Sequence, residues 1–156
     1  MKTQKARKLF FDDDGSRFFM ARDDVEAEYL NFKVDAATET KWLIELTDQK
    51  LKDLEYKGNW RSVYFFNHHQ DYRYLTVVSC TKAKGVFWER CAFLEESLAY
   101  AFANPANSIN TSLVKEVVQK VLEQGELLLT RVKAEGSIAR VNAIIKQCRF
   151  ALKKMK

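Results

Sequence analysis

The sequence is poor in the residues that interrupt regular structure or cross-link small folds. Its 156 residues include one proline, five glycines and three cysteines. The glycines stand singly, so no glycine-rich phosphate-binding loop is present. The cysteines are odd in number and lack C-x-x-C spacing, which excludes a disulfide framework and a thiolate metal knuckle. Because free thiols are typical of a reducing compartment, we expect a cytoplasmic protein.

Long apolar runs are also missing. No uninterrupted apolar run approaches the roughly 18 residues that a membrane span needs, so we expect no membrane span. Hydrophobic residues make up 47% of the chain and charged residues 30%, which is an ordinary globular balance. The length is near that of one domain, and no linker, repeat or low-complexity tract is visible. We therefore predict a single domain over residues 1–156.

The first half of the sequence favours strands. Apolar residues 9–11 and 17–20 flank an Asp-Gly pair, a strong hairpin signal. Alternation over 28–35 and 42–46 predicts two more strands, and the aromatic segments 60–66 and 72–79 predict a second hairpin. Residues 48–57 have a helical pattern, which Gly58 ends. That helix could extend backwards through Trp42 if Thr38 caps it, so the pattern leaves 40–47 open between strand and helix.

The second half has helical periodicity. Phe87, Cys91, Leu94 and Leu98 recur at steps of three and four, in a helix expected to end before Asn104 and Pro105. Valines from 114 to 132 predict a second helix, and heptad spacing over 138–155 predicts a third. Gly136 and Ser137 are expected to form the tight turn between these two helices. The predicted fold is therefore α+β: an N-terminal antiparallel sheet of about six strands with one short helix inserted, then three helices, the last two an αα-hairpin. The heptad seam could also pair two chains, as a homodimer through the helical hairpin.

Positive charge is concentrated at one end of the sequence. Residues 131–156 hold eight Lys and Arg against one Glu, so they carry +7 while the whole chain carries +5. Lys146, Arg149, Lys153 and Lys156 fall on one flank of the predicted last helix. Such a flank suits phosphates, an acidic protein or an anionic membrane. The alternative is a solvated face, in which cations near a helix C-terminus interact favourably with the helix dipole.

The predicted aromatic hairpin is a second candidate surface. Tyr72, Arg73 and Tyr74 lie in its second strand. Aromatic residues interleaved with arginine on a sheet bind single-stranded nucleic acid by stacking and phosphate neutralisation. Aromatic residues on one strand face, as Trp60, Tyr64 and Phe66 would be, more often belong to a core.

Candidate catalytic groups are few. His68, His69 and Asp71 could bind zinc or serve acid-base chemistry, but adjacent loop residues rarely converge on one metal and a polar hairpin tip explains them. Cys91 lies on an apolar helical face, where a free cysteine is usually a core residue. Adjacent Glu95 and Glu96 point in different directions on a helix. We expect no metal and no cofactor, and the balance is against an enzyme, although a site built from distant residues would leave no local pattern.

These observations lead to two hypotheses for function. The first is a non-catalytic cytosolic binding or accessory protein, of the inhibitor or immunity type, that uses the predicted sheet face or its basic C-terminal helix against an acidic protein. The alternative is a nucleic-acid-binding protein that contacts phosphates through the basic helix and the aromatic hairpin.

Overall fold

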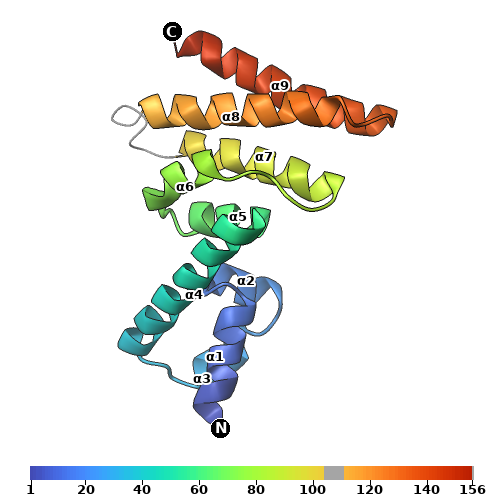
Figure 1. Cartoon of the computed structure of the whole chain (residues 1–156). Coiled ribbons are helices and arrows are strands. Elements are labelled where there is room, and N and C mark those ends of the chain that lie inside the picture. The colour runs from blue at the N-terminus through green and yellow to red at the C-terminus, as the bar shows by residue number, and fades with distance from the viewer. Residues whose placement is uncertain (104–110, 156) are drawn as a thin grey trace. The chain divides into compact units, whose positions relative to one another are not determined.

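The structure is a computed structural model that describes residues 1–103 and 111–155, and over these residues the protein is all-helical. The predicted α+β fold and its antiparallel sheet are wrong, since no strand occurs among the described residues. The helices are α1 (Lys2–Asp12), α2 (Arg17–Arg22), α3 (Glu26–Asn31), α4 (Ala36–Lys57), α5 (Trp60–His68), the 3-10 helix η1 (Tyr72–Tyr74), α6 (Leu75–Cys80), α7 (Phe87–Ala103), α8 (Thr111–Leu129) and α9 (Glu135–Lys154). Figure 1 shows their order along the chain.

The chain divides into two compact units, which we call unit 1 (Met1–Leu51) and unit 2 (Lys52–Lys156). The division falls inside α4. Unit 1 has a small aromatic core in which Phe10 packs against Trp42 with ring centroids 5.6 Å apart and against Tyr29 at 6.2 Å. The Tyr29 hydroxyl donates to Glu39 at 2.7 Å, and Arg17 lies over the Tyr29 ring. These contacts join α1, α2, α3 and the first part of α4.

The predicted hairpin over 9–20 is two helices joined by a tight corner. Asp14 and Gly15 have φ of 51° and 66°, the left-handed values that a hairpin turn would also need. Here they end α1, and the Gly15 N–H donates to the Phe10 carbonyl at 2.7 Å. Ser16 then caps α2 by accepting from the Phe19 N–H. The Asp-Gly pair does lie in a tight turn, but the turn joins two helices, so the predicted hairpin is wrong.

The two following strand predictions are also wrong. Residues 28–35 contain α3 and the turn after it, and 42–46 lie within α4. The alternation of Trp42, Ile44 and Leu46 misled because Ile44 is 59% exposed, whereas Trp42 and Leu46 are buried four residues apart as in a helix. The alternative of one helix running back through Trp42 is confirmed, and Gly58 ends it. Its cap is Asp35 rather than Thr38, since Asp35 accepts the Thr38 N–H at 2.8 Å.

Unit 2 begins with helices where the aromatic hairpin was predicted. In α5 the buried residues are Ser62, Val63, Phe65 and Phe66, a helical rather than an alternating pattern. Asn59 caps this helix by accepting the Arg61 N–H at 3.0 Å. Residues 72–79 form η1 and most of α6. Aromatic residues on both faces of α5 concealed the helical period.

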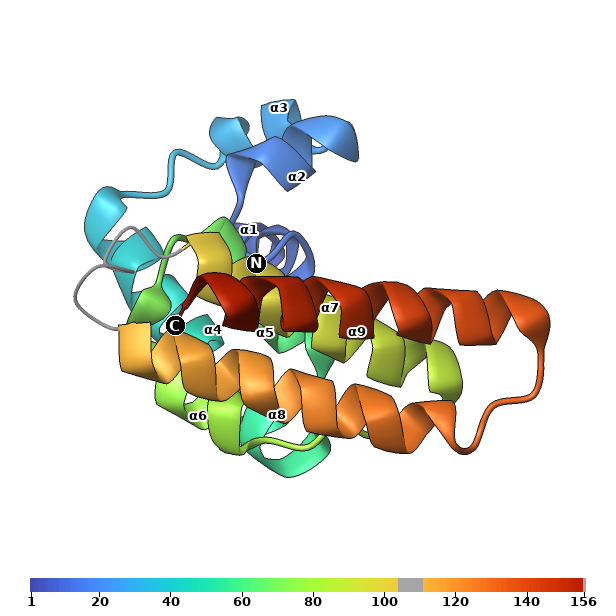
Figure 2. The same ribbon diagram turned by 90° about the horizontal axis from the view of Figure 1, so that it is seen from above.

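The three helices predicted for the second half are present. In α7, Cys91, Leu94 and Leu98 are buried as expected, and the helix ends at Ala103, while Asn104 and Pro105 lie outside the described residues. Figures 1 and 2 show α8 and α9 side by side and antiparallel, with α7 beneath them, so the αα-hairpin is as predicted. Gly125 of α8 lies where α8 and α9 are close together. A Cβ on this residue would lie only 3.3 Å from the Ile145 side chain of α9, a tight contact that glycine avoids. Gly136 and Ser137 do not form the turn; they lie in the first turn of α9.

Candidate functional site

The predicted basic flank lies on the outward face of α9. Val141, Ile145 and Cys148 of the heptad seam are buried within unit 2, whereas Lys146, Arg149 and Lys153 are exposed. Lys156 lies outside the described residues. Because the seam packs within the chain, a second copy could use it only if α9 left α8. The outward face of α9 is therefore the part of this helix that is available to a partner.

One of the predicted cations is already engaged. The Arg149 guanidinium contacts Glu126 of α8 at 2.9 Å. Lys146 and Lys153 have no carboxylate partner among the residues that the structure describes. Between them Phe150 is 60% exposed, and Lys154 lies 4.5 Å from the centroid of its ring. We call Lys146, Phe150, Lys153 and Lys154 the basic face of α9; it presents an aromatic ring surrounded by lysines.

Tyr72, Arg73 and Tyr74 are separate from this face and take part in local structure. Arg73 holds Asp71 through two hydrogen bonds of 2.8 and 2.7 Å, which lower the pKa of that carboxyl. The Tyr72 ring packs on Tyr100, and the Tyr74 ring packs on Phe66 with centroids 4.5 Å apart. Both tyrosines are partly buried, and their rings pack against other aromatic residues.

The histidines and Cys91 do not assemble a reactive site. His68 stacks on Tyr64, and His69 packs against Phe65 with centroids 4.5 Å apart. Cys91 is fully buried, and burial raises the pKa of its thiol, which keeps it protonated and a poor nucleophile.

The adjacent Glu95 and Glu96 of α7 have different surroundings. Glu95 binds Arg140 through two hydrogen bonds of 2.9 and 2.7 Å. Burial raises the pKa of Glu96, with its neighbour Glu95 adding to the effect.

Among the described residues no three His, Cys, Asp or Glu side chains could share a metal ion. Within the same residues no helix has the length and hydropathy to cross a membrane.

Charge compensation differs sharply between the two units. In unit 1, six of nine Lys and Arg pair with a carboxylate: Lys5, Arg7, Lys8, Arg17, Arg22 and Lys50. Sixteen Lys and Arg are described in unit 2, and only five of them pair: Lys57, Arg73, Lys120, Arg140 and Arg149. The remaining eleven have no carboxylate partner among the described residues, so unit 2 carries positive charge that its own fold does not neutralise.

Two further groups of these unpaired cations form where distant parts of the chain meet, and each includes one residue of a segment already discussed, Arg61 of 60–66 and Arg131 of 131–156. The first surrounds a tryptophan pair at the start of α5 and α7. Trp60 and Trp88 meet edge to face with centroids 6.3 Å apart, and Arg61 lies 5.6 Å from the Trp60 ring. These side chains and Lys84 line a cavity of about 350 Å³. Trp60 and Trp88 are far apart in the sequence, so only the packing of α5 on α7 could bring them together.

The second group lines another cavity of about 350 Å³, between the loop after α6, the helix α7 and the end of α8. Lys82, Arg90 and Arg131 contribute the positive charge, and leucines contribute the apolar wall. No local pattern relates these three residues, which come from the loop after α6, from α7 and from the turn after α8. Their juxtaposition is therefore a product of the tertiary fold.

Comparisons with known proteins give no further guide, since no family model, curated protein or solved structure matches the chain. The site has to be interpreted from its own geometry.

Proposed function

We propose that this chain is a non-catalytic binding protein that takes an acidic protein partner through the basic face of α9. The observation that carries the proposal is Phe150, an aromatic ring 60% exposed between lysines that have no carboxylate partner among the described residues. Exposed aromatic residues are frequent anchors in protein interfaces, and a charged rim steers the partner and selects its sign. The three free cysteines support the cytoplasmic location that we propose with this function.

An acidic protein is favoured over nucleic acid because of the aromatic residues. Binding of single strands relies on several aromatic rings that stack on successive bases. The basic face of α9 offers one ring, Phe150, and the rings of Tyr72 and Tyr74 pack against other aromatic residues. A single apolar anchor with a lysine rim is better suited to an acidic protein surface with an apolar depression.

The test is affinity capture from the native cell with the wild-type chain and matched variants, before and after nuclease treatment. We expect an acidic protein that survives nuclease and is lost with Phe150→Ser and with the double variant Lys146→Glu/Lys153→Glu. Lys133→Glu is the control, since Lys133 is exposed, lies outside α9 and carries the same charge. All these positions are exposed, so the melting temperature should move little.

Two results would reject this proposal. If nuclease removes the captured material, and a fluorescent oligonucleotide binds with an affinity that falls steeply with salt, the partner is nucleic acid. If the captured protein is retained by both α9 variants, the interface lies elsewhere on the chain.

A further inference from the structure

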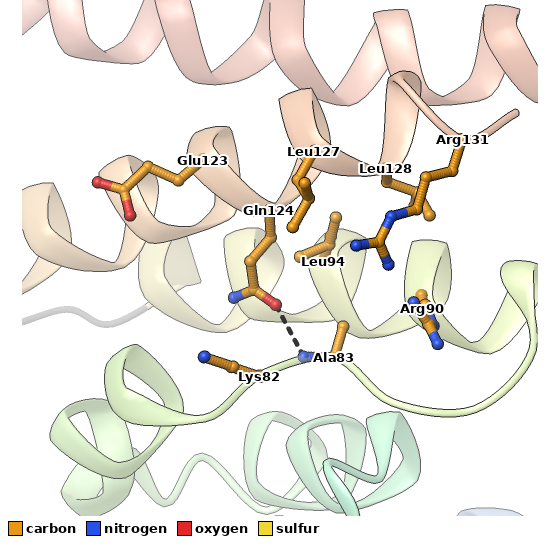
Figure 3. Close-up of a pocket in the computed structure, with 9 residues that line it drawn as sticks. All are labelled: Lys82, Ala83, Arg90, Leu94, Glu123, Gln124, Leu127, Leu128 and Arg131. Atoms are coloured by element: carbon orange, nitrogen blue, oxygen red, sulfur yellow. Dashed lines mark hydrogen bonds between the residues drawn. The ribbon is translucent and has the colours of Figure 1, made fainter.

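The cavity at the end of α8 is shown in Figure 3. Its volume of about 350 Å³ lies within the range of small-molecule sites, roughly 300 to 1,000 Å³. Nine residues line it: Lys82, Ala83, Arg90, Leu94, Glu123, Gln124, Leu127, Leu128 and Arg131. Three of them are leucines and three are cations, so the cavity combines an apolar wall with positive charge.

Hydrogen bonds fix one wall of this cavity. The Gln124 side-chain oxygen accepts the Ala83 N–H at 2.7 Å, and its amide nitrogen donates to the Thr81 carbonyl at 3.4 Å. Gln124 thereby holds the loop after α6 against α8 (Figure 3). Arg90 Nε donates to the Gly85 carbonyl at 2.8 Å, which orients its guanidinium. The cavity is thus shaped before any ligand arrives, which reduces the entropic cost of binding.

Charge is distributed unevenly around the cavity. Figure 3 shows Arg90 and Arg131 on one side of Leu94 and Leu127, with Lys82 and Glu123 toward the other. Among the described residues of the lining, Glu123 is the only one with a carboxylate, and it contacts Lys120. Neither arginine has a carboxylate partner among the described residues. Two guanidinium groups at one end of a cavity repel each other, and an anion between them would relieve that repulsion through charge-assisted hydrogen bonds.

We propose that this cavity binds a small organic anion, a carboxylate or phosphate monoester, whose aliphatic body lies against Leu94 and Leu127. The anionic group lies between Arg90 and Arg131. An aliphatic body is favoured because none of the described residues that line the cavity is aromatic, so they offer a nucleobase no ring to stack on. This site is independent of the basic face of α9, and either proposal can fail without the other.

The probes are octanoate, octyl phosphate, octylamine and inorganic phosphate, titrated by calorimetry into the full chain. We expect octanoate and octyl phosphate to bind at least about tenfold more tightly than octylamine, which has the same body and the opposite charge. Octyl phosphate should also exceed inorganic phosphate, since burying the chain against leucine adds affinity. In an NMR titration the shifts should be largest at the Ala83 amide and the Gln124 side-chain amide.

Two variants test the two halves of the site. Arg131→Gln should weaken octanoate about tenfold, the expected effect of losing a charge-assisted contact. Leu127→Ser should weaken octanoate severalfold and leave inorganic phosphate unaffected, because it removes apolar area alone. Both positions are exposed, so folding should persist, which circular dichroism will verify. Lys133→Gln is the control because Lys133 is exposed and does not line the cavity.

The proposal is overturned if octanoate gives no heat and no NMR shift at millimolar concentration. It is equally overturned if octylamine binds as well as octanoate, or if Arg131→Gln and Lys133→Gln behave alike. Equal affinities for inorganic and octyl phosphate would show that the leucines take no part.

Discussion

The two units of this chain use charge in different ways. Unit 1 has a net charge of −2, from nine Lys and Arg against eleven Asp and Glu, and most of its cations are paired. Several pairs connect different helices, as Arg17 of α2 and Glu39 of α4 do at 2.6 Å. Unit 2 has a net charge of +7, from seventeen Lys and Arg against ten Asp and Glu. There most of the described cations are unpaired.

This difference indicates where association should occur. Exposed ion pairs contribute only about 0 to 1 kcal/mol each, so unit 2 loses little stability by leaving its cations unpaired. Excess charge of one sign opposes compaction slightly and attracts anions from a distance. Most cations of unit 1 are therefore used in ion pairs, several of them between helices, whereas most described cations of unit 2 are left for the ligands that we propose. Both binding proposals place the ligand on unit 2.

The largest expected effects concern whether the units unfold together, as a single domain over 1–156 requires. Leu98→Ala in unit 2 and Leu46→Ala in unit 1 each truncate a buried leucine and should each lower the free energy of unfolding by about 2 to 5 kcal/mol. Because α4 runs through the division between the units, we expect one urea transition.

Trp42 provides a separate probe of unit 1. In the background Trp60→Phe/Trp88→Phe it is the only tryptophan, while circular dichroism reports all helices. If the Trp42 curve and the circular dichroism curve coincide, and either leucine variant shifts both, the chain unfolds as one domain. If Leu46→Ala shifts the Trp42 signal and leaves most of the dichroism transition in place, the units are separate domains.

The helical half could be predicted from the sequence because its core residues follow one period. Val117, Val121 and Leu128 lie on one face of α8, and Val141, Ile145 and Cys148 on one face of α9. In the first half, α2, α3, α5 and α6 contain too few turns to establish a period, and within the long α4 the alternation of Trp42, Ile44 and Leu46 imitated a strand. In α5 the exposed Tyr64 lies between buried Val63 and Phe65, so aromatic content outweighed periodicity and favoured strands.

The candidate sites also differ in whether the sequence could predict them, according to whether their residues lie on one helix or on several elements. Lys146 and Lys153 could be placed on an exposed face of α9 because one helix contains both. The Arg90 and Arg131 pair and the Trp60 and Trp88 pair depend on how separate helices pack. No spacing rule within the sequence reports such contacts, since the residues share no element.

A smaller effect tests how far unit 2 depends on close packing of α8 on α9. Gly125→Ile should lower stability by about 1 to 3 kcal/mol, because a side chain there would push against Ile145. The control, Gly136→Ala, places a Cβ in the first turn of α9 with no atom within 4 Å, and should raise stability by about 0.5 to 1 kcal/mol. Urea denaturation measures both. Equal tolerance of the two substitutions would mean that α8 and α9 are not closely packed.

The contrast in charge can be tested directly on stability. Glu39→Gln in unit 1 removes the ion pair with Arg17 and weakens the hydrogen bond from Tyr29, and should cost about 1 to 2 kcal/mol. Lys153→Gln in unit 2 removes a charge with no described partner and should change stability by less than about 0.5 kcal/mol. Urea midpoints at low and moderate salt give both values. A loss of stability with Lys153→Gln as large as that with Glu39→Gln would abolish the distinction between the units.

The smallest effect concerns Asp71 and Arg73, an ion pair of unit 2 that resembles those of unit 1. The hydrogen bonds from Arg73 lower the pKa of Asp71 below its value of about 3.9 in the unfolded chain. The pair therefore contributes its full stability above about pH 4, and this contribution is lost as the pH falls through the lower folded pKa. Asp71→Asn should cost about 0.2 to 1 kcal/mol at neutral pH and make stability decline less steeply in acid.

Urea midpoints measured from neutral pH to about pH 3 give this slope. The series extends to about pH 3 so that it passes below the pKa of about 3.9 that aspartate has in the unfolded chain. The matched control is Glu116→Gln, which removes an exposed carboxylate of α8 that has no ion-pair partner among the described residues. It should leave the acid slope nearly unchanged, because Glu116 is exposed and has no ion pair among the described residues that protonation would break. If Asp71→Asn has the same slope as Glu116→Gln, the Asp71 pair contributes nothing in solution. Unit 2 would then differ from unit 1 even at its best-formed exposed ion pair.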